Sequence, residues 1–247
     1  ANLAADTSLD PADRYIKYLY DHNRILEIKF PDVGGAANLS NVIYTYGNSN
    51  NETGRVVMQQ DATGTQEFQY GSMGEVTLNT RTVVGPSIPT RIFVTSFLYD
   101  SWNRIRTIEY PDMEKVDYHY DLGGNLKSIR GDVNGDPYYY VEKIRYDHYE
   151  QRTYIKHGNG TENTYTYSPD LRRLENMTAY SSDANKMFDN NYAYDKVGNV
   201  LNIKGVAPPN STNLIGGPYE HGYTYDNLNR LISSEGYYEG DLAQAAN

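Results

Sequence analysis

Carboxylates are the most numerous side chains here that could carry chemistry, with 32 Asp and Glu among 247 residues. A glycosidase needs two carboxyl groups that converge across a cleft, and Asp112 with Glu114 is the pair that could be imagined in that role. The recurring Asp residues, however, occur singly, each directly after a Tyr and, except at Asp147, a few positions before Gly or Asn. An Asp in that place caps the backbone amides of a tight turn. We therefore predict a structural role for these Asp residues and no catalytic residue.

One segment has part of the pattern of a metal site. Asp132, Asn134 and Asp136 match the first three ligand positions of a calcium loop, but Pro137 replaces the turn Gly and Lys143 replaces the last Glu. A solvated hairpin turn explains the same residues. None of the five His residues has the pair spacing of a zinc-protease motif. The sequence has no Cys, which excludes disulfides and thiol chemistry, and we predict neither a metal nor a cofactor.

Composition restricts the partners and the kind of core. A net charge of −10 argues against nucleic acid, which is bound by Lys and Arg, and against anionic membrane surfaces. No apolar run approaches the ~20 residues that span a bilayer, so no membrane insertion is expected. Only 38% of the residues are hydrophobic, and 26 of the 32 aromatic residues are Tyr. Because Tyr covers apolar area but keeps a hydroxyl that needs a partner, broad half-wet sheets are expected.

The elements that position these residues are strands arranged in a repeat. The segment 118–126 has Tyr at alternate positions, an Asp- and Gly-containing turn and then an aliphatic residue, and the pattern recurs at 97–105, 192–200 and 223–231. Alternation with period 2 is typical of a strand, and repeats of this length indicate an array. Nine repeats follow one another at a spacing of about 26 residues. Their anchor residues are Tyr20, Tyr46, Tyr70, Tyr99, Tyr120, Tyr146, Tyr167, Tyr194 and Tyr225.

The turn after each anchor tyrosine defines the repeat. Asp can bond amides two residues further on, and Gly or Asn can take the left-handed backbone of the reversal. The sixth repeat is degenerate, because Thr153 follows Arg152 where an aliphatic residue is expected. The turn residues to which we assign a structural role are Asp21, Asp100, Arg104, Asp121, Gly124, Asn125, Asp147, Asp195, Gly198, Asn199, Asp226 and Arg230.

These patterns predict an all-β fold, a repetitive up-and-down array of antiparallel hairpins with about 18 strands. Such an array forms a curved sheet or a section of a hollow β-shell. We expect a lead-in segment at 1–13, the array at 14–236 and a tail at 237–247, in a mature piece or excised fragment. The segments 83–89, 181–190 and 205–218 are expected to be long loops.

The repeats resemble the YD repeats, also called RHS repeats, of bacterial RHS and insecticidal toxin-complex proteins and of the animal teneurins. The resemblance covers about residues 14–236 and implies a sheet wound into a hollow shell, which encloses a C-terminal effector in the toxins. It implies a non-enzymatic structural segment of a secreted or cell-surface bacterial protein, with the rest of a larger chain or an effector cargo as partner. The family's self-cleavage motif is not found after Tyr225, so autoproteolysis is not assigned.

Two other functions stay open, together with one consequence of the architecture. Exposed Tyr rows could bind glycans in an extracellular adhesion module, although Tyr can equally pack across strands. Paired repeats could form the blades of a β-propeller enzyme, but the unequal spacing and the lack of a convergent site argue against it. The first and last strands, near 15–20 and 231–237, carry few charges. Such edges favour self-association.

Overall fold

A computed structural model describes residues 15–31, 41–85, 87–209 and 216–238. It contains 18 strands in one hydrogen-bonded sheet. The helical structure in the described residues is a single turn of 3-10 helix at Asn50–Glu52. The prediction of an all-β array of antiparallel hairpins is confirmed.

The chain divides into two compact units, Ala1–Asp117 and Tyr118–Asn247, and the division falls within β9 (Lys115–Tyr120). The strands of the N-terminal unit are β1 (Lys17–Asp21), β2 (Arg24–Lys29), β3 (Val42–Tyr46), β4 (Val56–Asp61), β5 (Gly64–Tyr70), β6 (Val76–Gly85), β7 (Ile88–Tyr99) and β8 (Ile105–Glu109). The strands of the C-terminal unit are β10 (Leu126–Val133), β11 (Asp136–Tyr146), β12 (Arg152–His157), β13 (Glu162–Tyr167), β14 (Leu174–Tyr180), β15 (Lys186–Tyr194), β16 (Val200–Gly205), β17 (Tyr219–Tyr225) and β18 (Leu231–Tyr238).

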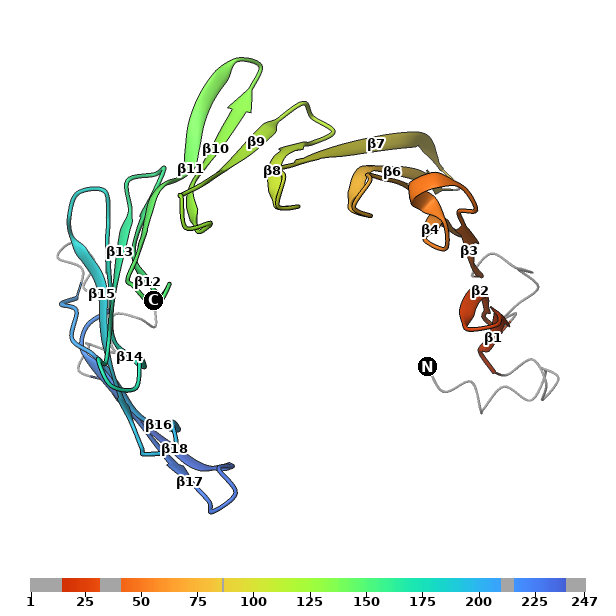
Figure 1. Cartoon of the computed structure of the whole chain (residues 1–247). Coiled ribbons are helices and arrows are strands. Elements are labelled where there is room, and N and C mark those ends of the chain that lie inside the picture. The colour runs from red at the N-terminus through yellow and green to blue at the C-terminus, as the bar shows by residue number, and fades with distance from the viewer. Residues whose placement is uncertain (1–14, 32–40, 86, 210–215, 239–247) are drawn as a thin grey trace. The chain divides into compact units, whose positions relative to one another are not determined.

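Within each unit every strand pairs with the next one along the chain, and the strands lie side by side in one layer (Figure 1). All but the first of the nine anchor tyrosines are the last residues of their strands, and the return strand begins after a short turn. The sequence pattern and the structural repeat therefore coincide.

One of the expected loops is mostly strand, and a second is half strand. The segment 83–89 belongs to a long hairpin, in which β6 and β7 pair as far as Gly85 opposite Ile88. In the segment 181–190, β15 already begins at Lys186. The ladder of the neighbouring hairpin continues into both segments, so strand pairing outweighs their low regularity in sequence. Part of the third expected loop, residues 210–215, lies outside the described residues.

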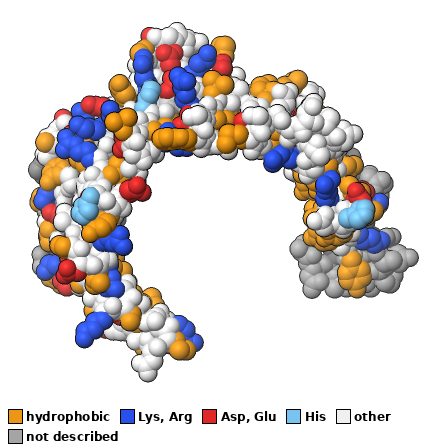
Figure 2. All heavy atoms as spheres, viewed as in Figure 1, with side chains coloured by type: hydrophobic (Ala, Val, Ile, Leu, Met, Phe, Trp, Pro, Cys, Tyr) orange, Lys and Arg blue, Asp and Glu red, His pale blue; other side chains and the backbone are white. Residues whose placement is uncertain are grey.

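A one-layer sheet buries little. Among the described residues, the buried hydrophobic side chains are Ile108, Val116, Ile155, Ala179 and Ala207. Hydrophobic side chains also reach the surface of both units (Figure 2). Ile108 and Val116 face each other across β8 and β9, so burial comes from neighbours within the layer. No helix in the described part of the chain is long and apolar enough to cross a membrane.

The two faces of the layer differ at the anchor tyrosines. In β9, Tyr118 and Tyr120 are half-buried while His119 between them is exposed. The same alternation occurs at Tyr192 and Tyr194 on either side of an exposed Ala193. It recurs at the ends of β3, β5, β7, β11, β13 and β17. One face thus carries the anchor tyrosines, which neighbouring side chains cover in part.

Candidate functional site: the junctions between repeats

The turn after Tyr99 shows how an Asp closes the repeat. Oδ1 of Asp100 accepts hydrogen bonds from the amides of Trp102 (2.9 Å) and Arg104 (3.0 Å). The amide of Asp100 donates to the carbonyl oxygen of Arg104, and Asn103 takes a left-handed φ of 59°. One carboxylate therefore satisfies amides that the reversal removes from the ladder.

The same amide-to-carboxylate bonds recur along the chain. In the seventh repeat Ser168 replaces Asp, and its Oγ accepts from the amide of Arg173 (3.1 Å). The other turns in which backbone amides donate to the Asp carboxylate are Asp121 with Asn125, Asp147 with Tyr149 and Gln151, Asp195 with Val197, Gly198 and Asn199, and Asp226 with Leu228 and Arg230.

The left-handed position of the turn is less restricted than the sequence suggests. Gly198 (φ 106°) and Asn229 (φ 60°) agree with the expectation of Gly or Asn. In the sixth and seventh repeats Glu150 (φ 63°) and Arg172 (φ 54°) take this conformation, so the expectation is wrong there. The sixth repeat, degenerate in sequence at Thr153, still forms the turn, because the amides that bond to Asp147 belong to Tyr149 and Gln151, which precede that position.

Seven anchor tyrosines join their own repeat to the one before it. Their hydroxyls donate to a backbone carbonyl oxygen near the start of the preceding return strand. We call this contact, with any Arg that stacks on the tyrosine ring, a junction. The donor–acceptor pairs are Tyr46 to Ile25 (3.0 Å), Tyr70 to Val56 (2.6 Å), Tyr99 to Val76 (2.9 Å), Tyr146 to Leu126 (2.9 Å), Tyr167 to Arg152 (2.9 Å), Tyr194 to Leu174 (2.9 Å) and Tyr225 to Val200 (2.9 Å).

Each junction lies where the backbone ladder has ended. Between β4 and β5 the register runs from Asp61 opposite Gly64 to Met58 opposite Glu67. Val56 and Tyr70 lie beyond that last pair, and the hydroxyl of Tyr70 bonds the carbonyl oxygen of Val56. The tyrosine side chain thus takes the place of a ladder hydrogen bond. It ties together strands that have separated to enter two different turns.

Burial changes the acidity of the junction tyrosines. Desolvation raises the pKa of five of them, because the ionised phenolate would lose water and could no longer donate to the carbonyl. These five are Tyr70, Tyr99, Tyr146, Tyr167 and Tyr194, and at all of them except Tyr99 a nearby Arg partly offsets the rise in pKa. The junctions therefore depend on a neutral hydroxyl.

An Arg strengthens some junctions from the preceding repeat. The guanidinium of Arg173 lies 5.7 Å from the ring centroid of Tyr194 and donates to the carbonyl oxygens of Asp195 and Lys196. A Cβ at Gly198 would lie 3.3 Å from Nη2 of Arg173. The turn Gly thus provides the left-handed backbone and also leaves room for this Arg. Cation–π contact with a partly buried ring stabilises by about 0.5–2 kcal/mol.

Two further junctions have the same arrangement. Arg24 lies 5.5 Å from the ring centroid of Tyr46, and a Cβ at Gly54 would lie 3.0 Å from its Nη2. Arg55 lies 5.4 Å from the ring centroid of Tyr70 and occupies the space above Gly74 in the next turn.

Arg104 and Arg230 bond within their own turns. Nε of Arg104 donates to Oδ2 of Asp100 (2.8 Å), and the guanidinium stacks on Trp102 at 4.6 Å. Nε of Arg230 donates to Oδ2 of Asp226 (2.7 Å).

The same contacts lower the pKa of the turn Asp residues. The Arg104 side chain is the largest cause of the lowered pKa of Asp100, and the Arg230 amide is the largest cause at Asp226. Desolvation alone would raise the pKa of Asp195, but bonds from Asn199, Gly198 and Val197 outweigh it and lower the pKa.

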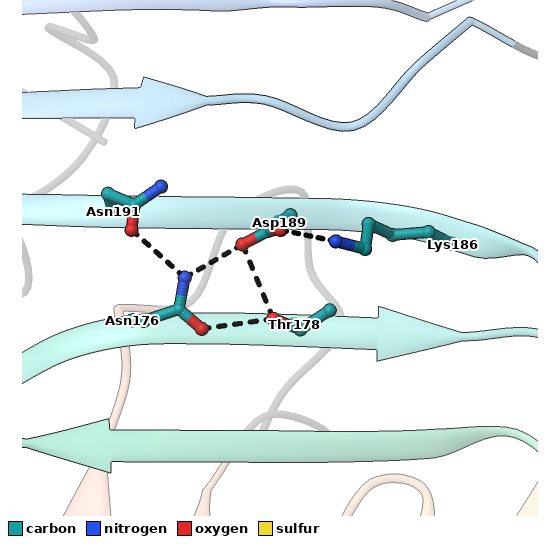
Figure 3. A network of polar contacts seen from close by, with 5 residues as sticks. All are labelled: Asn176, Thr178, Lys186, Asp189 and Asn191. Carbon is teal, nitrogen blue, oxygen red and sulfur yellow. Dashed lines mark hydrogen bonds and ion pairs between the residues drawn. The ribbon is translucent and has the colours of Figure 1, made fainter.

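The opposite face carries polar ladders. Figure 3 shows one on β14 and β15, where Nδ2 of Asn176 donates to Oδ1 of Asp189 (2.7 Å) and of Asn191 (3.1 Å). Thr178 donates to Oδ1 of Asn176 (2.9 Å), and Lys186 pairs with Oδ2 of Asp189 at 2.6 Å. The hydrogen bond from Lys186 is the main cause of the lowered pKa of Asp189. Each carboxylate oxygen has a partner, so the network holds two strands in register.

The segments weighed for other chemistry are turns. Oδ1 of Asp132 accepts from the amide of Gly135 (2.8 Å) in the hairpin that links β10 and β11. Oδ1 of Asp112 accepts from the amide of Glu114 (3.2 Å), in the turn between β8 and β9. Among the described residues, no group of three or more His, Asp or Glu side chains is placed to hold a metal ion.

Two roles were not foreseen from the sequence. The sequence analysis considered the packing of Tyr across strands, whereas the contact that the anchor tyrosines share is a hydroxyl bond to a backbone carbonyl oxygen. The sequence assigns Arg104 and Arg230 to their turns, but it does not predict that Arg173 contacts the next repeat. A signal for that role is present, because Gly54, Gly74 and Gly198 each follow a repeat that ends in Arg24, Arg55 or Arg173.

The chain has a relative among toxin subunits. It is 33% identical over 136 residues to the toxin subunit YenC1 of Yersinia entomophaga, a match that covers 51% of this chain and 14% of that subunit. No protein-family model matches the chain.

Solved toxin structures share the fold. A crystal structure of TcdB2-TccC3 superposes with a TM-score of 0.71 at 21% identity. A Photorhabdus luminescens Tc holotoxin pore superposes with a TM-score of 0.72 at 22% identity. In both cases the match covers 85% of this chain and 11% of the other chain. The chain is thus similar in sequence to a toxin subunit and in fold to chains of toxin complexes, which supports the resemblance of its nine repeats to the YD-repeat, or RHS-repeat, family.

Proposed function

We propose that the chain is a section of the wall of a toxin-complex shell, and that this wall encloses an effector polypeptide without doing chemistry itself. The junctions carry the proposal. Tyr hydroxyls, Asp carboxylates and Arg guanidinium groups, the side chains that could do chemistry, are engaged in closing turns and joining one repeat to the next. A sheet joined in this way can extend over many repeats while remaining one layer thick.

The partner in this proposal is the remainder of a larger chain, with its cargo, in a secreted or cell-surface bacterial protein. The chain spans 14% of the length of the YenC1 subunit and 11% of the chains in the solved complexes. The name of the relative supports a toxin context. A structural and non-catalytic role agrees with the geometry of the junctions.

A chimera tests enclosure. The chain replaces the matched segment of the Yersinia entomophaga subunit, and the rate at which protease digests the C-terminal segment of the chimera is compared with the rate for that segment alone. We expect strong protection in the chimera. Tyr146→Ala, which removes an interior junction, should reduce that protection, and Tyr139→Ala, at an exposed position of β11, should not. A folded, full-length chimera with an unprotected segment would contradict the proposal.

The edge strands give a second test, on the isolated chain. All five residues of β1 and all eight of β18 are exposed. Edges of this kind recruit further strands. We expect light scattering to show association that increases with concentration. A persistent monomer with both edge strands ordered and exposed would count against a wall section that needs neighbours.

A further inference from the structure

A groove on the C-terminal unit is built differently from the junctions. It has a volume of about 670 Å³ and lies over β15 to β18, on the face that carries the anchor tyrosines. This volume is within the range of small-molecule sites. The lining residues that matter here are Asn190, Tyr192, Ile203, Tyr219, His221 and Gly236.

Two glycines form the floor beneath two rings. Gly205 pairs with Tyr219 across β16 and β17, and a Cβ at Gly205 would collide with the Tyr219 ring. Gly236 pairs with His221 across β17 and β18, and a Cβ there would lie 2.9 Å from Nδ1 of His221. Each ring therefore lies against a strand backbone in the space that a side chain would fill. The rings stand 5.4 Å apart at 55°, so they form a shallow aromatic platform.

Hydrogen bonds fix the polar ends of the tyrosines. The hydroxyl of Tyr219 donates to Oδ1 of Asn190 (2.9 Å), and the hydroxyl of Tyr238 donates to the carbonyl oxygen of Gly216 (2.6 Å). A ring held in this way loses little side-chain freedom when a ligand covers it, which favours binding. The platform is thus organised before any ligand arrives.

The chemistry of the lining defines the class of ligand. None of the groove's lining residues is Asp, Glu, Lys or Arg, so nothing there matches a charged ligand. The platform provides aromatic faces, while the amide of Asn190 and the imidazole of His221 provide hydrogen-bonding groups at its side. A pyranose ring has the complementary form, with an apolar C–H face and hydroxyls around its rim. We propose that this groove binds a neutral oligosaccharide.

The test uses the whole chain, with maltotriose, cellotriose and triacetylchitotriose as probes. Binding of each sugar is measured by titration with saturation-transfer NMR. We expect saturable binding of at least one probe. Tyr219→Ala should weaken it about tenfold or more, since it removes half of the platform. Tyr138→Ala is the matched control, because Tyr138 lies over Gly131 in the same cross-strand pairing but outside the groove. It should leave the affinity unchanged.

A second pair of variants covers the case in which Tyr219→Ala unfolds, as circular dichroism would show. Gly236→Ala displaces His221 from the floor and should weaken binding. A Cβ at Gly222, the next glycine of the same hairpin, meets no atom within 4 Å, so Gly222→Ala should have no effect. Failure of all three sugars to saturate would overturn the proposal, as would an equal loss in a variant and its control. Neither result bears on the wall function, which the chimera tests separately.

Discussion

The fourth and seventh repeats end in an Arg at the same position, but they use it in opposite ways. In the fourth repeat Arg104 turns back to Asp100 and stabilises its own turn. In the seventh, Ser168 stands where the Asp would be, and Arg173 reaches forward to Tyr194 and the turn of the next repeat. Between these two repeats, the Arg bonds to its own turn where the carboxylate is present and contacts the next repeat where a Ser replaces it.

The second and ninth repeats extend this comparison. The turn of the second repeat has Gly47 after its anchor tyrosine, and Arg55 reaches forward to Tyr70. The ninth has Asp226, and Arg230 bonds back to it. In these four repeats a turn with Asp keeps its Arg, and a turn without that carboxylate has an Arg that reaches the following repeat. The first repeat differs, because Arg24 reaches forward to Tyr46 although Asp21 follows the anchor tyrosine.

The largest effect on the stability of the fold is expected at high pH, where repeats with and without a turn Asp should be destabilised together. Five junction tyrosines have a pKa raised above the ordinary value near 10. A pKa that is higher in the folded state means that stability is full below about pH 10 and is lost as the pH rises through the folded-state pKa. Thermal melts by circular dichroism between pH 8 and 11.5 should show a steep fall above pH 10. A flat profile would mean that the hydroxyl bonds contribute nothing.

The loss of a single junction should have the next largest effect on stability. Tyr194→Ala removes a hydroxyl bond and the ring beneath Arg173, and should cost about 2–3 kcal/mol. Tyr99→Ala removes a hydroxyl bond alone, because the preceding repeat ends in Glu75, and should cost about 1 kcal/mol less. Urea unfolding of the two variants measures the difference. Equal costs would remove the distinction between the two kinds of junction.

Substitutions of Arg173 and Arg104 should differ less in their cost to stability than the two Tyr substitutions do. Arg173→Gln loses the contact with Tyr194 and bonds to two carbonyl oxygens, at about 1–2 kcal/mol. Arg104→Gln loses an ion pair that is partly exposed, and should cost less. Hydrogen exchange locates the change: amides of β15 should lose protection in the first variant, and those of the turn at 99–105 in the second. The reverse pattern would refute the forward reach of Arg173.

The smallest effect on stability is expected at low pH. It should distinguish turns that are capped by an Asp from the turn that is capped by Ser168. Asp100 and Asp226 have a lowered pKa, so their contribution is full above the ordinary value near 3.8 and is lost as the pH falls through the folded-state pKa. The turn of the seventh repeat is capped by Ser168 and should keep its protection in hydrogen exchange down to about pH 3. Simultaneous loss in all three turns would show that the carboxylates are not the cause.

The strand order and the turn chemistry were accessible from the sequence because both are local. The spacing from Tyr120 through Asp121 to Leu126 identifies a hairpin without reference to any other part of the chain. The contact from Tyr194 to the carbonyl of Leu174 was not predictable in the same way, because every residue has a backbone carbonyl and the sequence does not indicate which one accepts the bond. The aromatic groove was also out of reach, because it depends on which glycine lies opposite Tyr219.

The hydroxyl bonds also have a direction along the chain. Every donor lies C-terminal to its acceptor, by 14 to 25 residues. Synthesis proceeds from the N-terminus, so each carbonyl leaves the ribosome before the tyrosine that will bond to it. A new repeat can therefore add to an edge that is already complete, and it never has to wait for a distant part of the chain. The sheet can grow at the pace of translation.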